Sequence, residues 1–398
     1  MQQAMAATAP ITSSERIGEL DVLRGFALFG VFVVHFVSSL YYLHPVDESV
    51  LSAWREDAFQ FAMLVLCDVL FLDKAITLFS VLFGIGFWVQ MQRFAAKGED
   101  FERLYLRRLL ILMLIGLINN FLLFPGDILF DYALFGFVLY YIRKLSARTM
   151  LISGLVLIFV ASQLAYGFLN PPWVDSEALD QDLKNALLSD SYSEWVVQLS
   201  QWHFADSIIS LGIIPLGLFI VGRFLIGAWI ARQNLIEKAR AAKPLVARIA
   251  AVSITVGLIL EGLTMAIWED VWALHDVFDF VFHAIAVPAL ALGYACVLIV
   301  ICGSSRWEWL TGLLAPVGRM ALTAYVGHGL FILAFAHPFG IYLRPVLSPA
   351  ASWFVAIGVF LGMSLFCRLW LGAFRFGPLE WIWRSLTYGE RQPLRRAA

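Results

Sequence analysis

The sequence predicts an all-α protein: a polytopic bundle of about ten transmembrane helices with both termini in the cytoplasm. Three observations support this prediction. Hydrophobic residues make up 61% of the 398 residues and charged residues only 15%, against about 45–50% and about 25% in soluble domains. Apolar windows recur along the chain, and lysine and arginine gather in alternate connections between them. Lipid is therefore the solvent that this composition fits.

Ten apolar windows come close to the roughly 20 residues that cross a bilayer as a helix. The window 58–71 is shorter, so a re-entrant, an interfacial and a packed position all stay open for it. The connection at about 170–206 is the longest, and we expect one or two surface helices there, with Trp195 and Trp202 at the membrane interface. The predicted spans lie near residues 22–42, 73–92, 107–124, 127–143, 149–169, 207–231, 247–268, 279–302, 313–336 and 351–374.

The charge of the connections predicts their side of the membrane. Lysine and arginine concentrate between spans two and three, four and five, and six and seven, and after span ten, whereas the 170–206 connection holds seven carboxylates against Lys184 alone. Basic connections stay in the cytoplasm, so both termini are predicted there. Residues 1–20 then form a disordered N-terminal tail, 21–376 a single transmembrane domain and 377–398 a cytoplasmic C-terminal segment.

Several functions lack support in the sequence. A net charge of −2 gives no basis for nucleic-acid binding, which leaves the lipid bilayer as the predicted partner. No P-loop, nucleophile elbow, HExxH motif or metal-ligand spacing occurs. Gly84 and Gly86 lie inside a span, where a close helix contact is a better explanation than a dinucleotide loop. The cysteines have no CxxC spacing and are predicted to be buried thiols: Cys67, Cys296, Cys302 and Cys367.

Charged residues inside spans are costly and usually face the interior of the bundle. Asp21 and Arg24 are one helical turn apart, so they form a structural ion pair or present Arg24 to a phosphate-bearing ligand. Lys74 opens span two, either as part of a helix cap or as a group that reaches an oxyanion. Glu261 and Arg223 are candidates to pair between neighbouring spans.

Two further polar residues and two histidines are candidates for chemistry. Asn119 lies deep in span three, and Asp127 starts span four, where it can also cap the helix. His35 lies about two-thirds along span one, and His44 lies just past its outer end. Imidazole titrates near neutral pH and can act as a general base, although for any single histidine a structural role is commoner.

Two spans share a short sequence similarity. Arg24-Gly25-Phe26-Ala27-Leu28 and Arg319-Met320-Ala321-Leu322 each open a span from the inside, and each span later carries a histidine, His35 or His328. One short match is weak support for an internal repeat.

Five blocks of sequence together point to a known family. The blocks are Leu20-Asp21-Val22-Leu23-Arg24-Gly25, Asp73-Lys74-Ala75 with Leu78 to Gly84, Arg107-Arg108 through Gly126-Asp127 to Ala133, Gly318-Arg319-Met320-Ala321-Leu322-Thr323, and Phe376 through Gly389. In this order, along nearly the whole chain, they resemble the YeiB family of bacterial membrane proteins. The closing block is the most specific. His35 stands where that family usually has Asn, and Asn119 stands where it often has His.

The YeiB family is distantly similar to transmembrane acyltransferases of the heparan-α-glucosaminide N-acetyltransferase type, which share an Asp-x-x-Arg-Gly start to the first span. The resemblance implies transfer of an acyl group from cytosolic acyl-CoA, across the bacterial inner membrane, to an envelope glycan, a lipid or a small metabolite. His44 or His35 is then the catalytic residue, and Lys74, Asn119 or Asp127 stabilises an oxyanion or lines a polar cavity. Acyl-CoA is a co-substrate, and no bound cofactor or metal is expected. The implied donor phosphate-binding residues are Arg24, Arg107, Arg108, Arg319 and Arg384, and structural pairing is assigned to Asp21 and Glu380.

Two other functions fit the same residues. A transporter or flippase without chemistry needs spans and buried charges equally, and basic connections that only set topology need no ligand. A non-catalytic partner of an envelope-synthesis complex is the third reading. The sequence also leaves a homo-oligomer open.

Overall fold

The computed structural model describes residues 18–39, 48–97, 101–124, 126–162, 164–165, 171, 174–267, 275–343 and 347–396. Within these ranges the chain is helical, with one isolated antiparallel bridge between Phe374 and Arg395. The α-helices are α2 (Gly18–Val33), α4 (Glu48–Glu56), α5 (Ala58–Leu70), α6 (Lys74–Lys97), α7 (Phe101–Leu122), α8 (Leu129–Ile142), α9 (Ala147–Val156), α11 (Ser176–Leu187), α12 (Tyr192–Phe204), α13 (Ile213–Arg232), α14 (Leu235–Ala241), α15 (Lys243–Ile267), α16 (His275–Ile301), α17 (Glu308–Arg319), α18 (Ala321–Ala336), α19 (Pro349–Ala373) and α20 (Pro378–Tyr388). The short π- and 3-10 helices are η2 (Val34–Ser39), η3 (Leu157–Ala161), η4 (Ala205–Ile209) and η5 (Ser305–Trp307).

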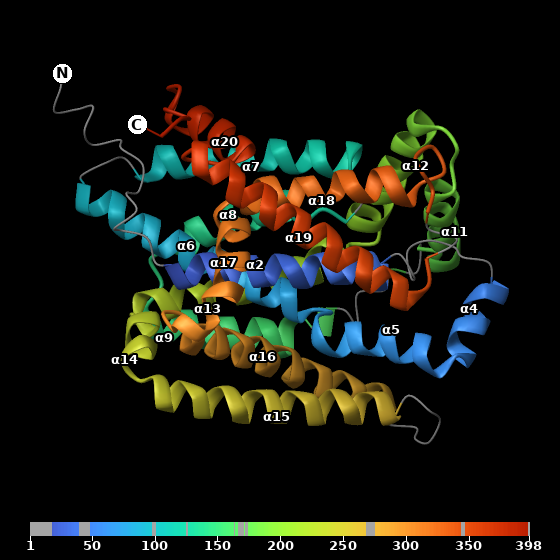
Figure 1. The fold of residues 1–398 in the computed structure, drawn as a ribbon, viewed down its shortest axis with the longest axis horizontal. Coiled ribbons are helices and arrows are strands. Elements are labelled where there is room, and N and C mark those ends of the chain that lie inside the picture. The colour runs from blue at the N-terminus through green and yellow to red at the C-terminus, as the bar shows by residue number, and fades with distance from the viewer. Residues whose placement is uncertain are drawn as a thin grey trace.

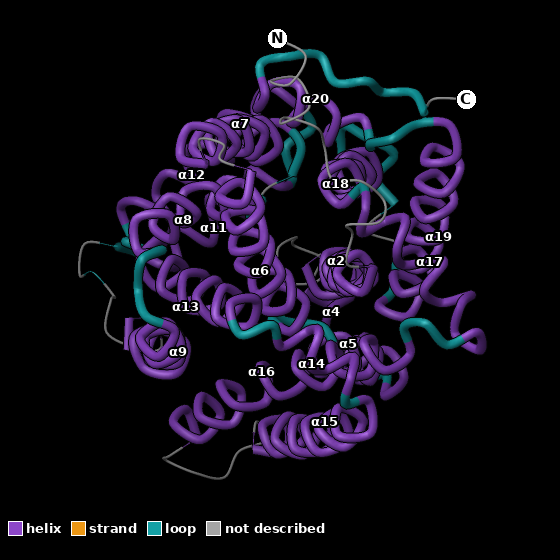
Figure 2. The backbone as a smooth tube through the Cα atoms, turned by 90° about the vertical axis from the view of Figure 1, so that its left-hand side faces the viewer, coloured by secondary structure: helices purple, strands orange, loops and turns teal. Residues whose placement is uncertain are grey.

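The long helices share one general direction and surround α2 (Figures 1 and 2). Helix α2 packs against α6, α16, α17, α18 and α19. Of its most apolar window, 67% of the residues are buried, the largest share among the candidate spans. The hairpin of α15 and α16 lies at one edge of the bundle (Figure 2). A helix that is enclosed on all sides can carry polar groups away from lipid, and α2 bears Asp21 and Arg24.

The chain is a helical membrane protein by the length and apolarity of its helices. Each of the ten predicted spans overlaps a helix, but the ninth, near 313–336, covers the bend between α17 and α18; among the described residues six helices are long and apolar enough to cross a membrane alone. A seventh span results if α17 and α18, which meet at an angle of 88°, count as one. The others fall short for physical reasons. Helix α8 has 14 residues, which is about 21 Å at 1.5 Å per residue against a hydrocarbon core of about 30 Å.

Glycines bring two pairs of helices into close contact. A Cβ atom on Gly84 of α6 or on Gly227 of α13 would overlap a backbone carbonyl of the other helix. Gly25 of α2 and Gly318 of α17 show the same reciprocal arrangement. Small residues allow such backbone contact in membranes, where close packing replaces the hydrophobic effect as a driving force. The predicted helix contact at Gly84 is confirmed, and these crossings hold α2, α6, α13 and α17 together.

The basic and acidic connections lie at opposite ends of the bundle. Helix α14, which carries Lys238 and Arg240, and helix α20 lie at one end, whereas α11 and α12 of the acidic connection lie at the other (Figure 1). The acidic connection thus contains two helices, as predicted. Trp195, which the sequence predicts at the membrane interface, has its side chain fully buried against Leu187 and Leu199, so it packs on protein rather than on lipid.

Three segments whose bounds were predicted from the sequence can be compared with the structure. Helix α2 begins at Gly18, three residues inside the predicted N-terminal tail. The 58–71 window is α5, a helix that packs on α19 and η2 through buried residues such as Cys67 while Phe59 stays exposed. The C-terminal segment folds as α20, which packs against α7 and α18.

Candidate functional site

A cavity of about 670 Å³ lies between α2, α6, α7, α8, α17, α18 and α20. Its volume is within the range of ligand-binding sites, which is roughly 300–1,000 Å³. Two carboxylates, Asp21 and Glu380, line it together with five arginines. The arginines come from five different helices: Arg24, Arg93, Arg108, Arg319 and Arg384. This excess of positive charge favours an anionic ligand.

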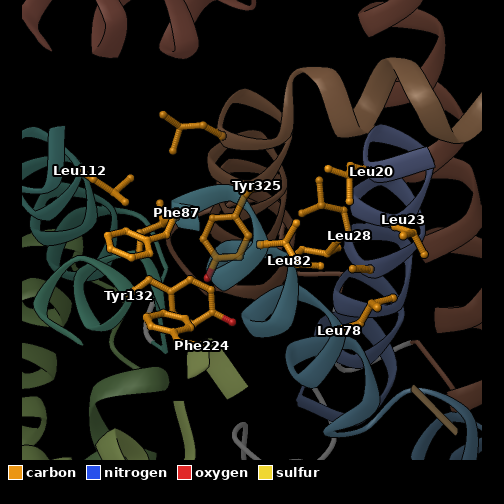
Figure 3. Packing of buried hydrophobic residues seen from close by; sticks show 14 of the residues in the cluster. Leu20, Leu23, Leu28, Leu78, Leu82, Phe87, Leu112, Tyr132, Phe224 and Tyr325 are labelled. Atoms are coloured by element: carbon orange, nitrogen blue, oxygen red, sulfur yellow. The ribbon is translucent and has the colours of Figure 1, made fainter. Parts of the chain in front are cut away.

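Most of the remaining wall of the cavity is apolar or aromatic. Phe87 and Leu112 lie on one side, Leu20 and Leu82 lie on the other, and the ring of Tyr325 stands between them (Figure 3). These side chains belong to the main hydrophobic core of the bundle. The cavity therefore joins a cationic region to an apolar interior, which suits a ligand with an anionic part and an apolar part.

Aromatic rings orient two of the cavity arginines. The guanidinium carbon of Arg108 is 3.6 Å from the ring centroid of Trp383, and the indole nitrogen of Trp383 donates to the carbonyl oxygen of Arg108 at 2.9 Å. The guanidinium carbon of Arg384 is 4.6 Å from the ring centroid of Phe376. Stacking on a ring holds the plane of the guanidinium in a fixed orientation, and a guanidinium can contact a phosphate or carboxylate through two parallel N–H groups. Arg24 is instead 3.1 Å from Asp21, which confirms that pair.

Glu380 joins the C-terminal segment to the bend between α17 and α18. Its Oε1 accepts from the backbone nitrogens of Leu322 at 2.7 Å and Thr323 at 3.0 Å, and its Oε2 accepts from the Thr323 hydroxyl at 2.5 Å. The first amides of a helix have no partner within the helix, so a side chain of α20 caps α18. Burial raises the pKa of Glu380 above its ordinary value of 4.5, partly offset by these hydrogen bonds.

Glu380→Gln should make thermal stability less dependent on pH. Because the carboxyl pKa is raised in the fold, its contribution to stability is largest below pH 4.5 and is lost as pH rises through the raised pKa. Glutamine keeps a capping oxygen but does not titrate. We therefore expect the melting temperature of the wild type relative to Glu380→Gln to fall as pH rises above 4.5. Glu380→Ala, which loses the cap, should be less stable than Glu380→Gln by about 0.5–2 kcal/mol at every pH, because neither residue titrates; a constant difference between wild type and Glu380→Gln would contradict the assignment.

Two histidines contact each other about one helical turn beyond Tyr325, which is part of the cavity wall. Nδ1 of His35 is 2.6 Å from Nε2 of His328, and Nδ1 of His328 contacts the carbonyl oxygen of Tyr325, the residue that lines the cavity. Phe32 stacks on His328, with ring centroids 4.7 Å apart, and Phe124 lies 4.5 Å from His35. The sequence marked both histidines but gave no reason to join them, because they are 293 residues apart.

Asp127 acts as a helix cap that also binds Asn119. Its Oδ2 accepts from the backbone nitrogens of Leu129 at 3.1 Å and Phe130 at 3.3 Å, at the start of α8. Its Oδ1 accepts from Nδ2 of Asn119 at 2.9 Å. The capping role predicted for Asp127 is confirmed, and the two candidate polar-cavity residues are in contact with each other. Neither lines the large cavity among the described residues.

Lys74 belongs to a separate buried cluster. Its Nζ is 2.6 Å from Oε1 of Glu261, and the two side chains are 0% and 1% exposed. His283 bridges Glu261, at 3.4 Å, and Asp73, at 3.1 Å. The sequence suggested Arg223 as the partner of Glu261. The structure pairs Glu261 with Lys74 instead, while Arg223 donates to the Thr77 hydroxyl at 2.8 Å.

The structure thus brings together four of the five predicted donor-binding arginines. Arg107 is the exception: it packs near Gly389, at the end of α20. His44 lies outside the described residues. Arg93, which the sequence assigned only to topology, joins the cavity, as does Tyr325. The basic run after span two was the signal for Arg93, but nothing local distinguishes a cavity arginine from one that only sets orientation.

Relatives of the chain match nearly its whole length. It is 30% identical to "Uncharacterized protein YxaH" of Bacillus subtilis (strain 168) over 410 aligned positions, which cover 98% of each chain. The chain belongs to the same family as this protein. Residues 230–390 match the family model described as "Protein of unknown function (DUF418)".

A second relative of this DUF418-containing family is "Uncharacterized protein YeiB" of Escherichia coli (strain K12), which is 27% identical over 94% of this chain and 96% of its own length. The predicted YeiB resemblance is confirmed. A protein described as "Uncharacterized 39.9 kDa protein in amylase 3'region" of Bacillus acidopullulyticus is 26% identical over 97% of each chain. No solved structure matches the chain.

Proposed function

We propose that this member of the DUF418 family is a transmembrane acyltransferase that takes its acyl group from cytosolic acyl-CoA. The observation that carries the proposal is the cavity in which five arginines face an apolar interior. Phosphate groups bind arginine through paired, charge-assisted hydrogen bonds. An acyl thioester is apolar and suits the inner part of the cavity. Acyl-CoA combines both features in one molecule.

The spacing along α2 supports an elongated donor. Arg24 lines the cavity and His35 follows eleven residues later on α2 and η2. At 1.5 Å per residue the two lie roughly 16 Å apart along the axis. A donor with phosphates at Arg24 and a reactive group near His35 must therefore be long, with a flexible arm between the two ends. The pantetheine arm of CoA has this layout.

The reaction that we propose needs one base. His35 takes the proton of an acceptor hydroxyl or amine, the acceptor atom forms a bond with the thioester carbonyl carbon, and the carbon–sulfur bond breaks. The CoA thiolate leaves with the electron pair and receives the proton from the imidazolium of His35. His44, as a second candidate for this role, belongs to the same proposal.

The finer topology is also part of the proposal. We place the arginine cavity on the cytoplasmic side of the bacterial inner membrane, with ten spans and both termini inside. The support is the position of α14 and α20 at one end of the bundle and of the acidic helices α11 and α12 at the other (Figure 1). The acceptor is then an envelope glycan, a lipid or a small metabolite that reaches the histidines from the opposite side.

Thermal unfolding of the detergent-purified protein with CoA and with acetyl-CoA tests the proposal. A ligand at about 100 times its dissociation constant stabilises by roughly 2.7 kcal/mol. We expect this stabilisation in the wild type and in Arg306→Ala, which removes an exposed arginine outside the cavity. It should be lost in Arg319→Ala and in Arg384→Ala. No stabilisation of the wild type at millimolar CoA would overturn the donor assignment.

One observation favours a transporter or flippase for an anionic lipid. The chain bends by 88° between α17 and α18, and broken helices of this kind surround substrates in many transporters. However, the first amides of α18 already donate to Glu380 rather than to a ligand. In this alternative too, an anion would therefore be bound by the cavity arginines. Movement of a fluorescent anionic lipid across vesicles containing the protein, without consumption of acetyl-CoA, would support transport over acyl transfer.

A further inference from the structure

The hydrogen bonds around the two buried histidines define where their protons lie. A carbonyl oxygen can only accept, so Nδ1 of His328, which contacts the carbonyl oxygen of Tyr325, carries a hydrogen. The remaining contact joins Nε2 of His328 to Nδ1 of His35 at 2.6 Å. Two N–H groups cannot form a hydrogen bond with each other, so one hydrogen is shared between these two nitrogens.

Only one nitrogen of the pair is then left to gain or lose a proton. In the neutral pair, His35 donates to His328 and Nε2 of His35 is a bare acceptor. If the pair takes up one proton, that proton resides on Nε2 of His35, whichever ring holds the shared hydrogen. Within the part of the chain that the structure describes, no hydrogen bond occupies this nitrogen. The two histidines also differ in exposure: His328 is 0% exposed, whereas His35, which carries the bare nitrogen, is partly exposed.

A second open acceptor lies beside the pair. Asn119 is 1% exposed, and its Nδ2 is committed to Asp127, which leaves Oδ1 without a hydrogen-bond partner. That oxygen lies against α18, 3.5 Å from where a Cβ of Gly329, the residue after His328, would lie. Phe124, which contacts the same point of Gly329, also packs on both histidine rings. A buried amide oxygen without a donor is uncommon and costly.

We propose that His35, His328 and Asn119 form the acceptor subsite, with Nε2 of His35 as its base and His328 as a positioning residue. Among the described side chains of the subsite, Nε2 of His35 and Oδ1 of Asn119 are the two acceptors without a hydrogen-bond partner, so the subsite favours a group that donates hydrogen bonds, a hydroxyl or an amine, over a carboxylate or phosphate. His328 holds His35 in the tautomer that leaves Nε2 bare and shares the positive charge when the proton is taken up. This inference rests on the proposed function for its chemistry, but its tautomers are a property of the protein alone.

Nitrogen NMR of the detergent-purified protein with 15N-labelled histidine tests the tautomers. A bare imidazole nitrogen and an N–H resonate far apart, and substitution of each histidine in turn assigns the signals. We expect hydrogen on Nδ1 and a bare Nε2 for both His35 and His328 above their titration. Hydrogen on Nε2 of His35 with a bare Nδ1 at that pH would overturn the proposal.

Two variants of His328 separate positioning from packing. His328→Phe keeps a ring against Phe32 but removes the acceptor, so His35 should redistribute its hydrogen between Nδ1 and Nε2. His328→Gln can offer an amide oxygen close to the position of Nε2 and should restore the wild-type tautomer of His35. His203→Phe, whose histidine contacts Asn120, the residue after Asn119 in α7, rather than the His35–His328 pair, should leave the hydrogen of His35 on Nδ1. An unaltered His35 signal in His328→Phe would remove the positioning role.

The outcomes also distinguish this inference from the proposed function. His328→Phe should retain the full thermal stabilisation by CoA, because it leaves the arginine cavity intact. Wild-type tautomers as expected without any CoA stabilisation would refute the donor assignment alone. CoA stabilisation together with the opposite tautomer of His35 would refute the acceptor subsite alone.

Discussion

Lys74→Met is expected to destabilise the protein by about 3–5 kcal/mol, because it breaks a buried ion pair by removing one partner. Lys74 and Glu261 are 2.6 Å apart and essentially without exposure, so the substitution leaves the buried carboxylate of Glu261 without the lysine charge, with His283 still 3.4 Å away. The uncompensated charge costs more than the pair itself contributes. Chemical or thermal unfolding in a fixed detergent, followed by intrinsic tryptophan fluorescence, gives the measurement.

The matched variants test the pairing itself. Glu261→Gln together with Lys74→Met removes both charges, and this double variant should recover most of the stability lost by Lys74→Met alone. Lys144→Met, at an exposed lysine, should change stability by less than about 0.5 kcal/mol. A loss below about 1 kcal/mol in Lys74→Met, or a double variant no more stable than the single one, would show that the two residues are not coupled.

Gly318→Ala is expected to destabilise by about 1–3 kcal/mol and to disturb the arginine cavity. A Cβ at Gly318 would overlap the carbonyl oxygen of Asp21, so α2 and α17 must separate to accept it. Gly318 also lines the cavity next to Arg319. We therefore expect Gly318→Ala to weaken stabilisation by CoA as well, measured in the same thermal unfolding experiment.

Gly312→Ala is a control for which we expect the opposite change in stability. Gly312 lies on α17 as well, and a Cβ there would meet no atom within 4 Å. Alanine is a better helix former than glycine by roughly 0.5–1 kcal/mol, so Gly312→Ala should be neutral or stabilising. Equal effects of the two substitutions would mean that the α2–α17 contact is looser than the structure indicates.

Local patterns in the sequence were sufficient to predict helices and contacts between residues that are close in the sequence. Apolar windows predicted where helices lie, because each window must satisfy its own backbone hydrogen bonds in lipid. Asp21 and Arg24 pair one turn apart, and Asp127 caps the helix that follows it, because such contacts depend only on nearby residues. The number of spans was harder to predict, since the apolar helices Leu129–Ile142 and Ala147–Ala161 are shorter than a full crossing.

Contacts between distant helices could not be predicted in this way. Trp195 is buried by neighbouring helices although its own sequence suggested an interface, and Lys74 meets Glu261 rather than a cap or an oxyanion. Four of the five arginines predicted for donor binding do converge, but Arg107, beside Arg108 in the sequence, does not line the cavity. Adjacent residues on a helix point about 100° apart, so the choice between them depends on which face the bundle encloses.

The sequence by itself determined that this chain is a helical membrane protein with a basic end and an acidic end, because hydropathy and charge act on each segment separately. Only the tertiary structure decided that five arginines share one cavity and that His35 meets His328. Those contacts depend on how glycine crossings such as those at Gly25 and Gly318 set helices against one another. Packing between segments is a property of facing surfaces, and no single window of sequence contains both faces.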